Sequence, residues 1–436
     1  MNQIAQQLNQ VIDKENPYIL EMLSDIGKNI FFPKGILSQS AEAKEKAHKL
    51  NATIGIATEE GKTMCFDSAV APVTDLQPDD FLTYAPSFGI PDLRKIWQNS
   101  LFEKNPSLVN KRISTPVVTC GITHAISVFA DLWVNPGDTV ILPDMMWGNY
   151  NLILGVRRGA NISSYPLFTN KGGFNLPAFD KCINKEAKKG SKIIVLLNFP
   201  NNPTGYTVTE KEGDQIVSKL TNLAQKGTNV VVACDDAYFG LFYDEDSIKE
   251  SLFARLCSRH SRLIPVKLDG ATKELFVWGL RVGFITYGSS AGQNPLALYD
   301  ALERKTAGCV RGSISNASRL SQLIVLKTME DRKYLSEKKE KFEILKRRAG
   351  QVKKVLSNPR YKDFWDVYPF NSGYFMCIRL KSVNAETLRC HLLEKYGVGL
   401  ISIGSDNLRI AFSCLEEKDI QTLFDTILQG VQDLAG

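Results

Sequence analysis

Hydrophobic and polar positions follow an α/β pattern through the middle of the chain. Runs rich in valine, isoleucine and leucine, bounded by turn residues, lie at 115–119, 139–142, 192–199, 229–235, 262–268 and 282–288. Such runs are typical of strands that are buried on both faces. Amphipathic segments, for example 122–133 and 209–225, lie between several of them and predict helices. Strands that alternate with helices predict an α/β fold with a mostly parallel sheet covered on both faces.

The two ends of the chain show a different pattern. Residues 1–50 have a helical pattern, and 51–57 predicts a short strand. Beyond the α/β region we expect a long helical segment at about 318–356, strands at 373–380, 398–403 and 408–412, and helices at 385–395 and from 416. A chain of 436 residues is too long for one simple core. We therefore expect a large domain at 60–320 and a small α+β domain formed by 1–59 and 321–436.

Composition excludes several classes of protein. The net charge of +6 is spread along the chain, and no basic patch with interleaved aromatic residues argues for nucleic acid. No apolar run is long enough to span a membrane, and the N-terminus lacks the features of a signal peptide. Nine cysteines without CxxC pairs favour a reducing compartment, and four scattered histidines support no metal site. We expect a cytoplasmic protein that binds no metal, nucleic acid or membrane.

One lysine stands out because of its neighbours. Lys273 follows Gly270, Ala271 and Thr272, and Arg281 comes eight residues later. Small residues leave room beside the amine for a flat group, and a desolvated lysine can condense with an aldehyde to give a Schiff base. An arginine can hold a phosphate through two parallel hydrogen bonds. Pyridoxal 5'-phosphate (PLP) carries both groups on one ring. A surface lysine and a surface arginine would explain this stretch equally well.

Polar residues also follow four of the predicted strands, at the sheet edge where α/β proteins bind ligands. Gly121, Ile122 and Thr123 open a helix, whose free N–H groups can bind an anion, although an ordinary helix cap reads the same way. Trp147 could stack on a flat ring or fill the core. Asn202, in the string NFPNNPTG, could bind a ring hydroxyl or belong to a tight turn.

The fourth strand end carries two carboxylates, Asp235 and Asp236, followed by Tyr238. A carboxylate at the end of a buried strand needs a partner, and a protonated pyridine nitrogen is a suitable one. Tyr238 could then hydrogen-bond the phenolic oxygen of the same ring. A metal site is the rival interpretation of the two aspartates, but no third carboxylate or histidine lies nearby in the sequence.

The ordered set of these motifs resembles the class I/II aminotransferases of PLP fold type I. It comprises Tyr84, Gly121-Ile122-Thr123, Trp147, Asn202-Pro-Thr-Gly205, Asp235-x-Ala-Tyr238, Lys273, Arg281 and Arg409. The resemblance covers the chain from about residue 50 to its end, and NFPNNPTG and the lysine-to-arginine spacing are highly specific. It implies a mostly parallel seven-stranded sheet, a small α+β domain and PLP as the cofactor.

The resemblance also implies a role for each cofactor residue. Lys273 would form the Schiff base and then carry a proton, Asp235 would pair with the pyridine nitrogen, and Asn202 and Tyr238 would contact the ring oxygen. Trp147 would stack on the ring. The phosphate would be held by Gly121, Ile122, Thr123 and Arg281, with Thr272 in place of the hydroxyl that the family usually has at Gly270. Tyr84 would reach the phosphate of a neighbouring subunit, which implies a homodimer with shared active sites.

For the substrate, the resemblance implies that Arg409 binds the α-carboxylate beside Asn202, and Ala57 is taken as a further contact. Arg311 matches the segment in which the aspartate and aromatic subgroup places an arginine, from the other subunit, for a distal carboxylate. A solvent-facing arginine at a helix end explains Arg311 equally well. Tyr150 stands where that subgroup more often has a histidine.

We therefore expect an aminotransferase that transfers the amino group of an acidic or aromatic L-amino acid to a 2-oxo acid such as 2-oxoglutarate by ping-pong chemistry. A lyase, decarboxylase or synthase on the same fold would use the same cofactor. A regulator that binds PLP without turnover is a further alternative, but no DNA-binding domain precedes the core. A nucleotide-binding dehydrogenase is another, but no GxGxxG motif follows the first strand.

Overall fold

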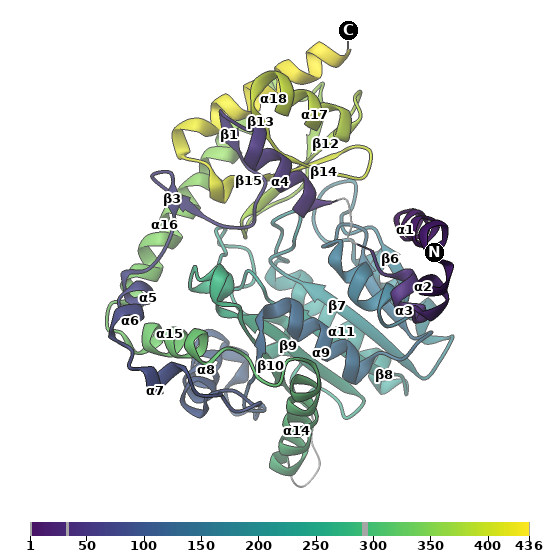
Figure 1. The fold of residues 1–436 in the computed structure, drawn as a ribbon, viewed down its shortest axis with the longest axis vertical. Helices are drawn as coiled ribbons and strands as arrows, with labels where there is room; N and C mark the ends of the chain where they lie inside the picture. Colours follow the sequence, from purple (N-terminus) through teal and green to yellow (C-terminus); the bar gives the residue numbers. More distant parts are fainter. Residues whose placement is uncertain (1, 32–34, 290–294, 436) are drawn as a thin grey trace.

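The computed structural model describes residues 2–31, 35–289 and 295–435 and is built around two sheets (Figure 1). The large sheet contains, in spatial order, β4 (Val117–Cys120), β10 (Val282–Tyr287), β9 (Leu263–Gly270), β8 (Asn229–Asp235), β7 (Lys192–Asn198), β5 (Thr139–Pro143) and β6 (Asn161–Tyr165). β10 runs antiparallel to both of its neighbours, β4 and β9, and all the other neighbouring pairs are parallel. The predicted fold class, an α/β fold with a mostly parallel seven-stranded sheet, is confirmed.

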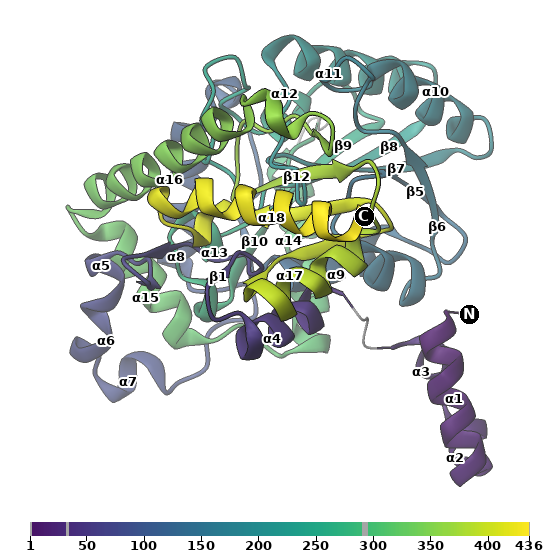
Figure 2. The same cartoon turned by 90° about the horizontal axis from the view of Figure 1, so that it is seen from above.

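Helices lie on both faces of this sheet. They are α8 (Pro91–Lys104), α9 (Gly121–Trp133), α10 (Leu176–Ala187), α11 (Glu210–Gln225), α12 (Leu252–Leu256) and α14 (Pro295–Ser313). Figure 2 shows α10 and α11 on one side of the strands and α9 on the other. The start of α11 is fixed by a capping box, in which Thr209 and Glu212 each bind the other's backbone N–H. α9 begins directly after β4, so the start of this helix lies at the carboxyl end of a strand.

The small sheet is antiparallel and closes the other side of the molecule (Figure 1). Its order is β11 (Trp365–Val367), β12 (Phe375–Leu380), β15 (Asn407–Ala411) and β14 (Ile401–Ile403). The long helix α16 (Tyr334–Leu356) leads to it, and α17 (Ala385–Tyr396) and α18 (Ile420–Ala435) pack beside it. Near the chain start, α4 (Ile36–Lys46) contacts β13 (Val398–Gly399), and β1 (Leu50–Asn51) pairs with β13 in parallel. The two ends of the chain therefore meet in this small unit.

Some predicted elements differ from the observed ones. The predicted strand at 51–57 is reduced to the two residues of β1. The helical segment at 318–356 is two helices, α15 (Arg319–Glu330) and α16, because the Asp331 carboxylate binds the Lys333 N–H at 2.7 Å and competes with the helix. Strand β6 was not predicted, because it is an edge strand with the polar sequence NISSY rather than a buried apolar run.

The first helices lie apart from both sheets. α1 (Gln3–Glu15), α2 (Pro17–Met22) and α3 (Asp25–Asn29) pack on one another, and Figure 2 shows them standing away from the small sheet. Of the predicted segment 1–59, it is therefore α4 and β1 that join the small unit. The domain limits at residues 60 and 320 stay a prediction.

The fold also contains several short strands and helices. They are β2 (Thr58–Glu59), β3 (Lys62–Thr63), α5 (Asp67–Val70), α6 (Pro72–Asp75), α7 (Pro78–Phe81) and α13 (Ala271–Glu274). None of the helices in the described ranges is long and apolar enough to cross a membrane.

Gly205 marks the closest approach between the loop after β7 and the small sheet. Its φ angle is +73°, and its carbonyl accepts N–H groups of Asn371 and Ser372, each at 2.9 Å. A Cβ atom at this position would lie 1.9 Å from the carbonyl oxygen of Phe375. Only glycine therefore fits between the two sheets here.

Gly205→Ala should destabilise the protein by about 3 kcal/mol or more, because the backbone of Phe375 must move to admit the methyl group. Gly137→Ala is the matched control, since Gly137 has φ +85° but open space around its Cβ position. We expect the control to lose only about 1 kcal/mol, the cost of the left-handed conformation. Urea unfolding of both variants measures the difference, and equal losses would contradict the close approach.

Candidate active site

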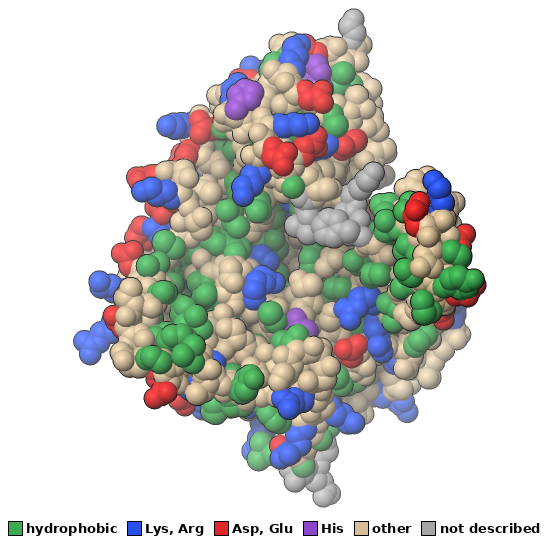
Figure 3. Space-filling model, in the orientation of Figure 1, with side chains coloured by type: hydrophobic (Ala, Val, Ile, Leu, Met, Phe, Trp, Pro, Cys, Tyr) green, Lys and Arg blue, Asp and Glu red, His purple; other side chains and the backbone are tan. Residues whose placement is uncertain are grey.

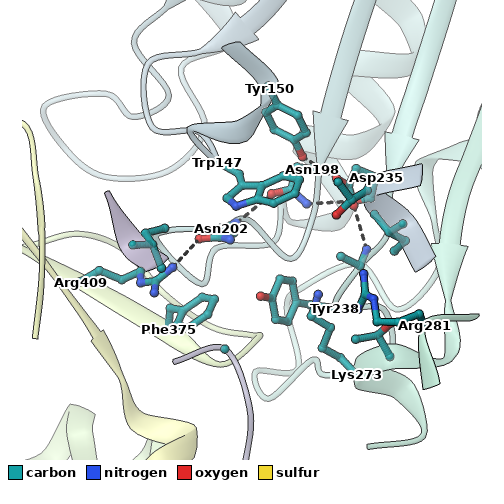
Figure 4. A pocket seen from close by; sticks show the side chains of 16 residues that line it. Trp147, Tyr150, Asn198, Asn202, Asp235, Tyr238, Lys273, Arg281, Phe375 and Arg409 are labelled. Carbon is teal, nitrogen blue, oxygen red and sulfur yellow. Dashed lines mark hydrogen bonds between the residues drawn. The ribbon is translucent and has the colours of Figure 1, made fainter. Parts of the chain in front are cut away.

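A cavity of about 230 Å³ lies where the carboxyl ends of the strands of the large sheet face the small sheet (Figure 4). Most of the residues singled out from the sequence line it: Ile122, Thr123, Trp147, Asn202, Asp235, Tyr238, Thr272, Lys273, Arg281 and Arg409. They come from positions almost 290 residues apart in the chain. The fold therefore gathers side chains of the kinds that PLP requires at one place.

Asp235 ends β8 and points into the cavity, fully buried. The hydroxyl of Tyr150 donates to its Oδ2 at 2.6 Å, and the Ala237 N–H donates to its Oδ1 at 3.0 Å (Figure 4). Burial raises the pKa of this carboxyl to about 6, although the Tyr150 and Ala237 hydrogen bonds and the Lys273 charge oppose the rise. A cation placed beside it would stabilise the carboxylate. Asp236 does not line the cavity and pairs with Lys267 instead.

Lys273 lies in α13, directly after β9, and its amine lies 4.7 Å from the centre of the Tyr238 ring. Burial lowers its pKa to about 8; Asp235 opposes this shift, and Arg281 adds to it. A larger share of a lysine with this pKa is neutral and reactive near neutral pH than of an ordinary lysine. Its neighbour Gly270 is needed for packing, because a Cβ atom there would lie 2.7 Å from the carbonyl oxygen of Val282.

Arg281 and the start of α9 lie together in the lining of the cavity. Gly121 does not line the cavity, but a Cβ atom on it would lie 2.5 Å from Nη2 of Arg281. The glycine therefore lets the guanidinium approach the free N–H groups at the helix start, next to Ile122 and Thr123. With the Thr272 hydroxyl nearby in the same lining, these groups can hold a phosphate.

Arg409 lies on β15 at the other end of the cavity and is only 1% exposed. Its Nη1 donates to Oδ1 of Asn202 at 3.2 Å, and its Nη2 donates to the carbonyl oxygen of Thr53 at 2.7 Å. The Phe375 ring lies 4.1 Å from the guanidinium carbon, and Nε has no partner among the described residues. No carboxylate in the described part of the chain pairs with this arginine, and burial lowers its pKa. The arrangement can receive a carboxylate from a ligand.

Besides Gly121, three predicted residues are absent from the lining of the cavity. Ala57 is buried elsewhere and its carbonyl accepts the Met64 N–H, so it does not line the cavity; Gly55, two residues earlier, does. Arg311, near the end of α14, does not line it either, and its Nη1 donates to the Ser315 hydroxyl at 2.6 Å. Tyr84 is 89% exposed at the surface.

The sequence reasoning also missed contributors to the lining. These are Ile36, Gly55, Tyr150, Asn198 and Phe375. Tyr150 had an available signal, because it follows Trp147 by three residues in the loop after β5, and the two rings pack edge to face at 5.5 Å. The sequence places Tyr150 in the same loop as Trp147, but it does not predict the hydrogen bond from Tyr150 to Asp235. No group of three or more histidine, cysteine or acidic side chains in the described ranges could hold a metal ion.

Comparison with known proteins shows the family to which the chain belongs. The family model described as "Aminotransferase class I and II" matches residues 47–427. A relative named "Probable N-acetyl-LL-diaminopimelate aminotransferase", from Bacillus subtilis, is 24% identical over 369 residues, which is 82% of this chain and 81% of the relative.

Two solved structures share the fold over nearly the whole chain. An aminotransferase from Anaerococcus prevotii superposes with a TM-score of 0.83 at 24% identity and covers 95% of this chain and 98% of its own. A kynurenine aminotransferase from Pyrococcus horikoshii, solved with PMP, gives 0.77 at 15% identity and covers 96% and 98%. The protein therefore belongs to the class I and II aminotransferase family and is a PLP-dependent aminotransferase.

Proposed function

We propose that the protein moves the amino group of an acidic or aromatic L-amino acid to a 2-oxo acid such as 2-oxoglutarate, in two successive half-reactions at the cavity described above. The observation that carries this proposal is the buried guanidinium of Arg409, which has only uncharged partners and an unpaired Nε atom. Amino acids and 2-oxo acids share a carboxylate next to the reacting carbon. One arginine can therefore bind both partners of the reaction in turn.

The other residues of the cavity have separate roles in the proposed reaction. PLP supplies an aldehyde and an electron-withdrawing ring when it is bound. Asp235, which Tyr150 holds in place, would pair with the ring nitrogen and favour its protonated form, and Trp147 would pack against the ring. Lys273, whose pKa is lowered to about 8, can take a proton from the α-carbon of the substrate and return one.

The phosphate and the ring oxygen are held by separate groups. We assign the phosphate to the start of α9 with Thr123, Thr272 and Arg281, because these groups converge at one end of the lining. We assign the ring oxygen to Asn202 and Tyr238. Asn202 then binds the cofactor and also orients Arg409, whose Nη1 it accepts. That link would align the substrate carboxylate with the ring.

The amino acid donor is decided by the groups that can bind its α-carboxylate and its side chain. Among the described residues of one chain, the cations that line the cavity are Lys273, Arg281 and Arg409. The rest of the lining includes Ile36 and Phe375, which suit an aromatic side chain. An acidic donor would need another cation for its distal carboxylate, and Arg311 of a second copy is the candidate.

A homodimer with shared active sites is part of this proposal. Exposed apolar side chains gather on one face of the chain, at Val70, Val73, Leu82, Tyr84 and Leu335. Figure 3 shows hydrophobic side chains over this region, around α5–α7 and α15. A patch of this kind is typical of an interface. Tyr84 would then be covered by the second copy and could reach its phosphate.

Mixing two impaired variants tests the shared site. Lys273→Ala should lose turnover by at least about a thousandfold while the fold is kept, and Tyr84→Ala should weaken cofactor binding. In a mixed dimer one site carries both defects and the other carries none. Activity that rises when the two purified variants are unfolded together and refolded would support sharing. Activity equal to the sum of the two variants, or a protein that sediments as an active monomer, would contradict it.

The low pKa of Lys273 has a consequence for the cofactor-free protein. The folded pKa is about 8 against an ordinary 10.5, so between these values the unfolded chain binds more protons and stability rises with pH. Lys273→Met removes this effect. The variant should gain stability over the parent below pH 8, and the advantage should shrink by up to about 3 kcal/mol as the pH rises through 10.5. Urea unfolding at pH 7 and pH 10.5 measures it, and a constant difference would contradict a desolvated lysine.

Two arginine variants test the binding of the donor. Arg409→Ala should lower kcat/KM for every amino acid about a hundredfold or more, because every donor has an α-carboxylate. Arg311→Ala should lower it for aspartate and glutamate and leave phenylalanine and tyrosine near the parent value. Steady-state kinetics with the four amino acids decide the matter. Equal losses for all four in Arg311→Ala would make this arginine structural.

A further inference from the structure

A second group of buried charges lies behind the cavity, on the side away from the cofactor site. Lys267, on β9, is 0% exposed, and its amine contacts the carboxylate of Asp236 and lies 3.6 Å from Oδ2 of Asp269. Asp236 also accepts the Ser251 hydroxyl at 2.6 Å, and Asp269 accepts the Trp97 Nε1–H at 3.2 Å. None of these side chains except Asp236 adjoins a residue of the cavity in sequence.

Lys267 contacts both ends of the turn that carries the cavity residues. Its amine meets Asp236 at the start of the turn and lies 4.5 Å from the ring centre of Phe239 at its end. The Phe239 N–H donates to the Asp236 carbonyl at 3.0 Å and closes the turn. The two residues between them, Ala237 and Tyr238, line the cavity. The Lys267 side chain therefore contacts both ends of the turn, at Asp236 and at Phe239.

The same turn fixes the carboxylate that faces the cavity. The Ala237 N–H donates to Oδ1 of Asp235 at 3.0 Å, so a shift of the turn would move the partner of this carboxylate. The Asp236 N–H in turn donates to the Leu268 carbonyl of β9 at 2.9 Å. The position of Asp235 thus depends on contacts that lie on the opposite side of the turn.

Behind the turn one buried lysine faces two buried aspartates. Burial works to lower the pKa of Lys267, but Asp236 and Asp269 together outweigh it and raise that pKa. Burial raises the pKa of Asp269 to about 6, with Asp236 and Glu274 adding to the rise and Lys267 and Lys104 opposing it. The buried Cys234 thiol also faces this group and has a raised pKa. Lys267 opposes the rise in pKa that burial causes in both aspartates and so favours their charged forms.

We propose that Lys267 is a positioning residue for the cofactor site: through Asp236 and Phe239 it holds the 236–239 turn, and thereby Asp235 and Tyr238, without touching cofactor or substrate. This proposal rests on the roles assigned above to Asp235 and Tyr238. It assigns unequal parts to the two aspartates that share the lysine. Asp236 belongs to the turn, whereas Asp269 only balances charge.

Asp236→Ala and Asp269→Ala form a matched pair, because each removes one buried carboxylate from the same lysine. The measurements are the dissociation constant of PLP, from absorbance titration, and the pH midpoint of the absorbance band of the bound cofactor. Asp236→Ala should weaken binding at least about tenfold and shift the midpoint. Asp269→Ala should stay within about twofold of the parent. Lys267→Met should weaken PLP binding and shift the midpoint as Asp236→Ala does.

Lys192→Met is the control for loss of a lysine from the large sheet, because Lys192 pairs with Asp138 at the far end of β7. It should bind PLP like the parent. Equal effects of the two aspartate variants, or none in Asp236→Ala, would overturn the proposal. The aspartate pair decides even if Lys267→Met does not fold. If the parent protein binds PLP and Lys273→Ala keeps full turnover, the site assigned to the reaction is wrong. That result would not count against the role proposed for the 236–239 turn.

Discussion

The structure depends on keeping three charged groups, Asp235, Lys273 and Arg409, buried around one cavity with few opposite charges. Burial raises the pKa of the first to about 6, lowers that of the second to about 8, and lowers that of the third. Groups in this state destabilise the empty protein and gain most from a ligand with complementary charges. A ring with a protonated nitrogen, an aldehyde and an amino acid carboxylate supplies such a ligand, so the same desolvation that costs stability prepares the site for chemistry.

The fold meets this requirement by placing each group at a rigid edge. Asp235 ends a strand buried in the centre of the large sheet, Lys273 lies in the short helix after the next strand, and Arg409 comes from the small sheet. Gly205 joins the two sheets where only a glycine fits. Further charges, such as Lys267, are paired behind the site and not in it. The residues that we assign to the cofactor therefore come from the large sheet, and the arginine that we propose for the substrate carboxylate comes from the small one.

The sequence was informative where one local pattern carries both structure and chemistry. The valine-rich run at 229–235 coincides with β8, and the polar residues after the strands line the cavity as expected. Prediction failed where position depends on distant packing. Ala57 was predicted as a substrate contact at the end of a short strand. The structure has no regular strand there, and Gly55 lines the cavity instead. The hydrogen bond of Tyr150 and the contacts of Lys267 arise only when strands far apart in sequence become neighbours, so no spacing rule could reveal them.

The most direct test of the account follows the absorbance of the bound cofactor. The protein is loaded with PLP, single L-amino acids are added without any 2-oxo acid, and 2-oxoglutarate is added afterwards. The account predicts that an aromatic or acidic amino acid converts the cofactor to its amine form in one turnover, that 2-oxoglutarate restores the original band, and that neither happens in Arg409→Ala at the same concentrations. A bound cofactor that no amino acid converts, or continuous release of ammonia or carbon dioxide, would contradict it.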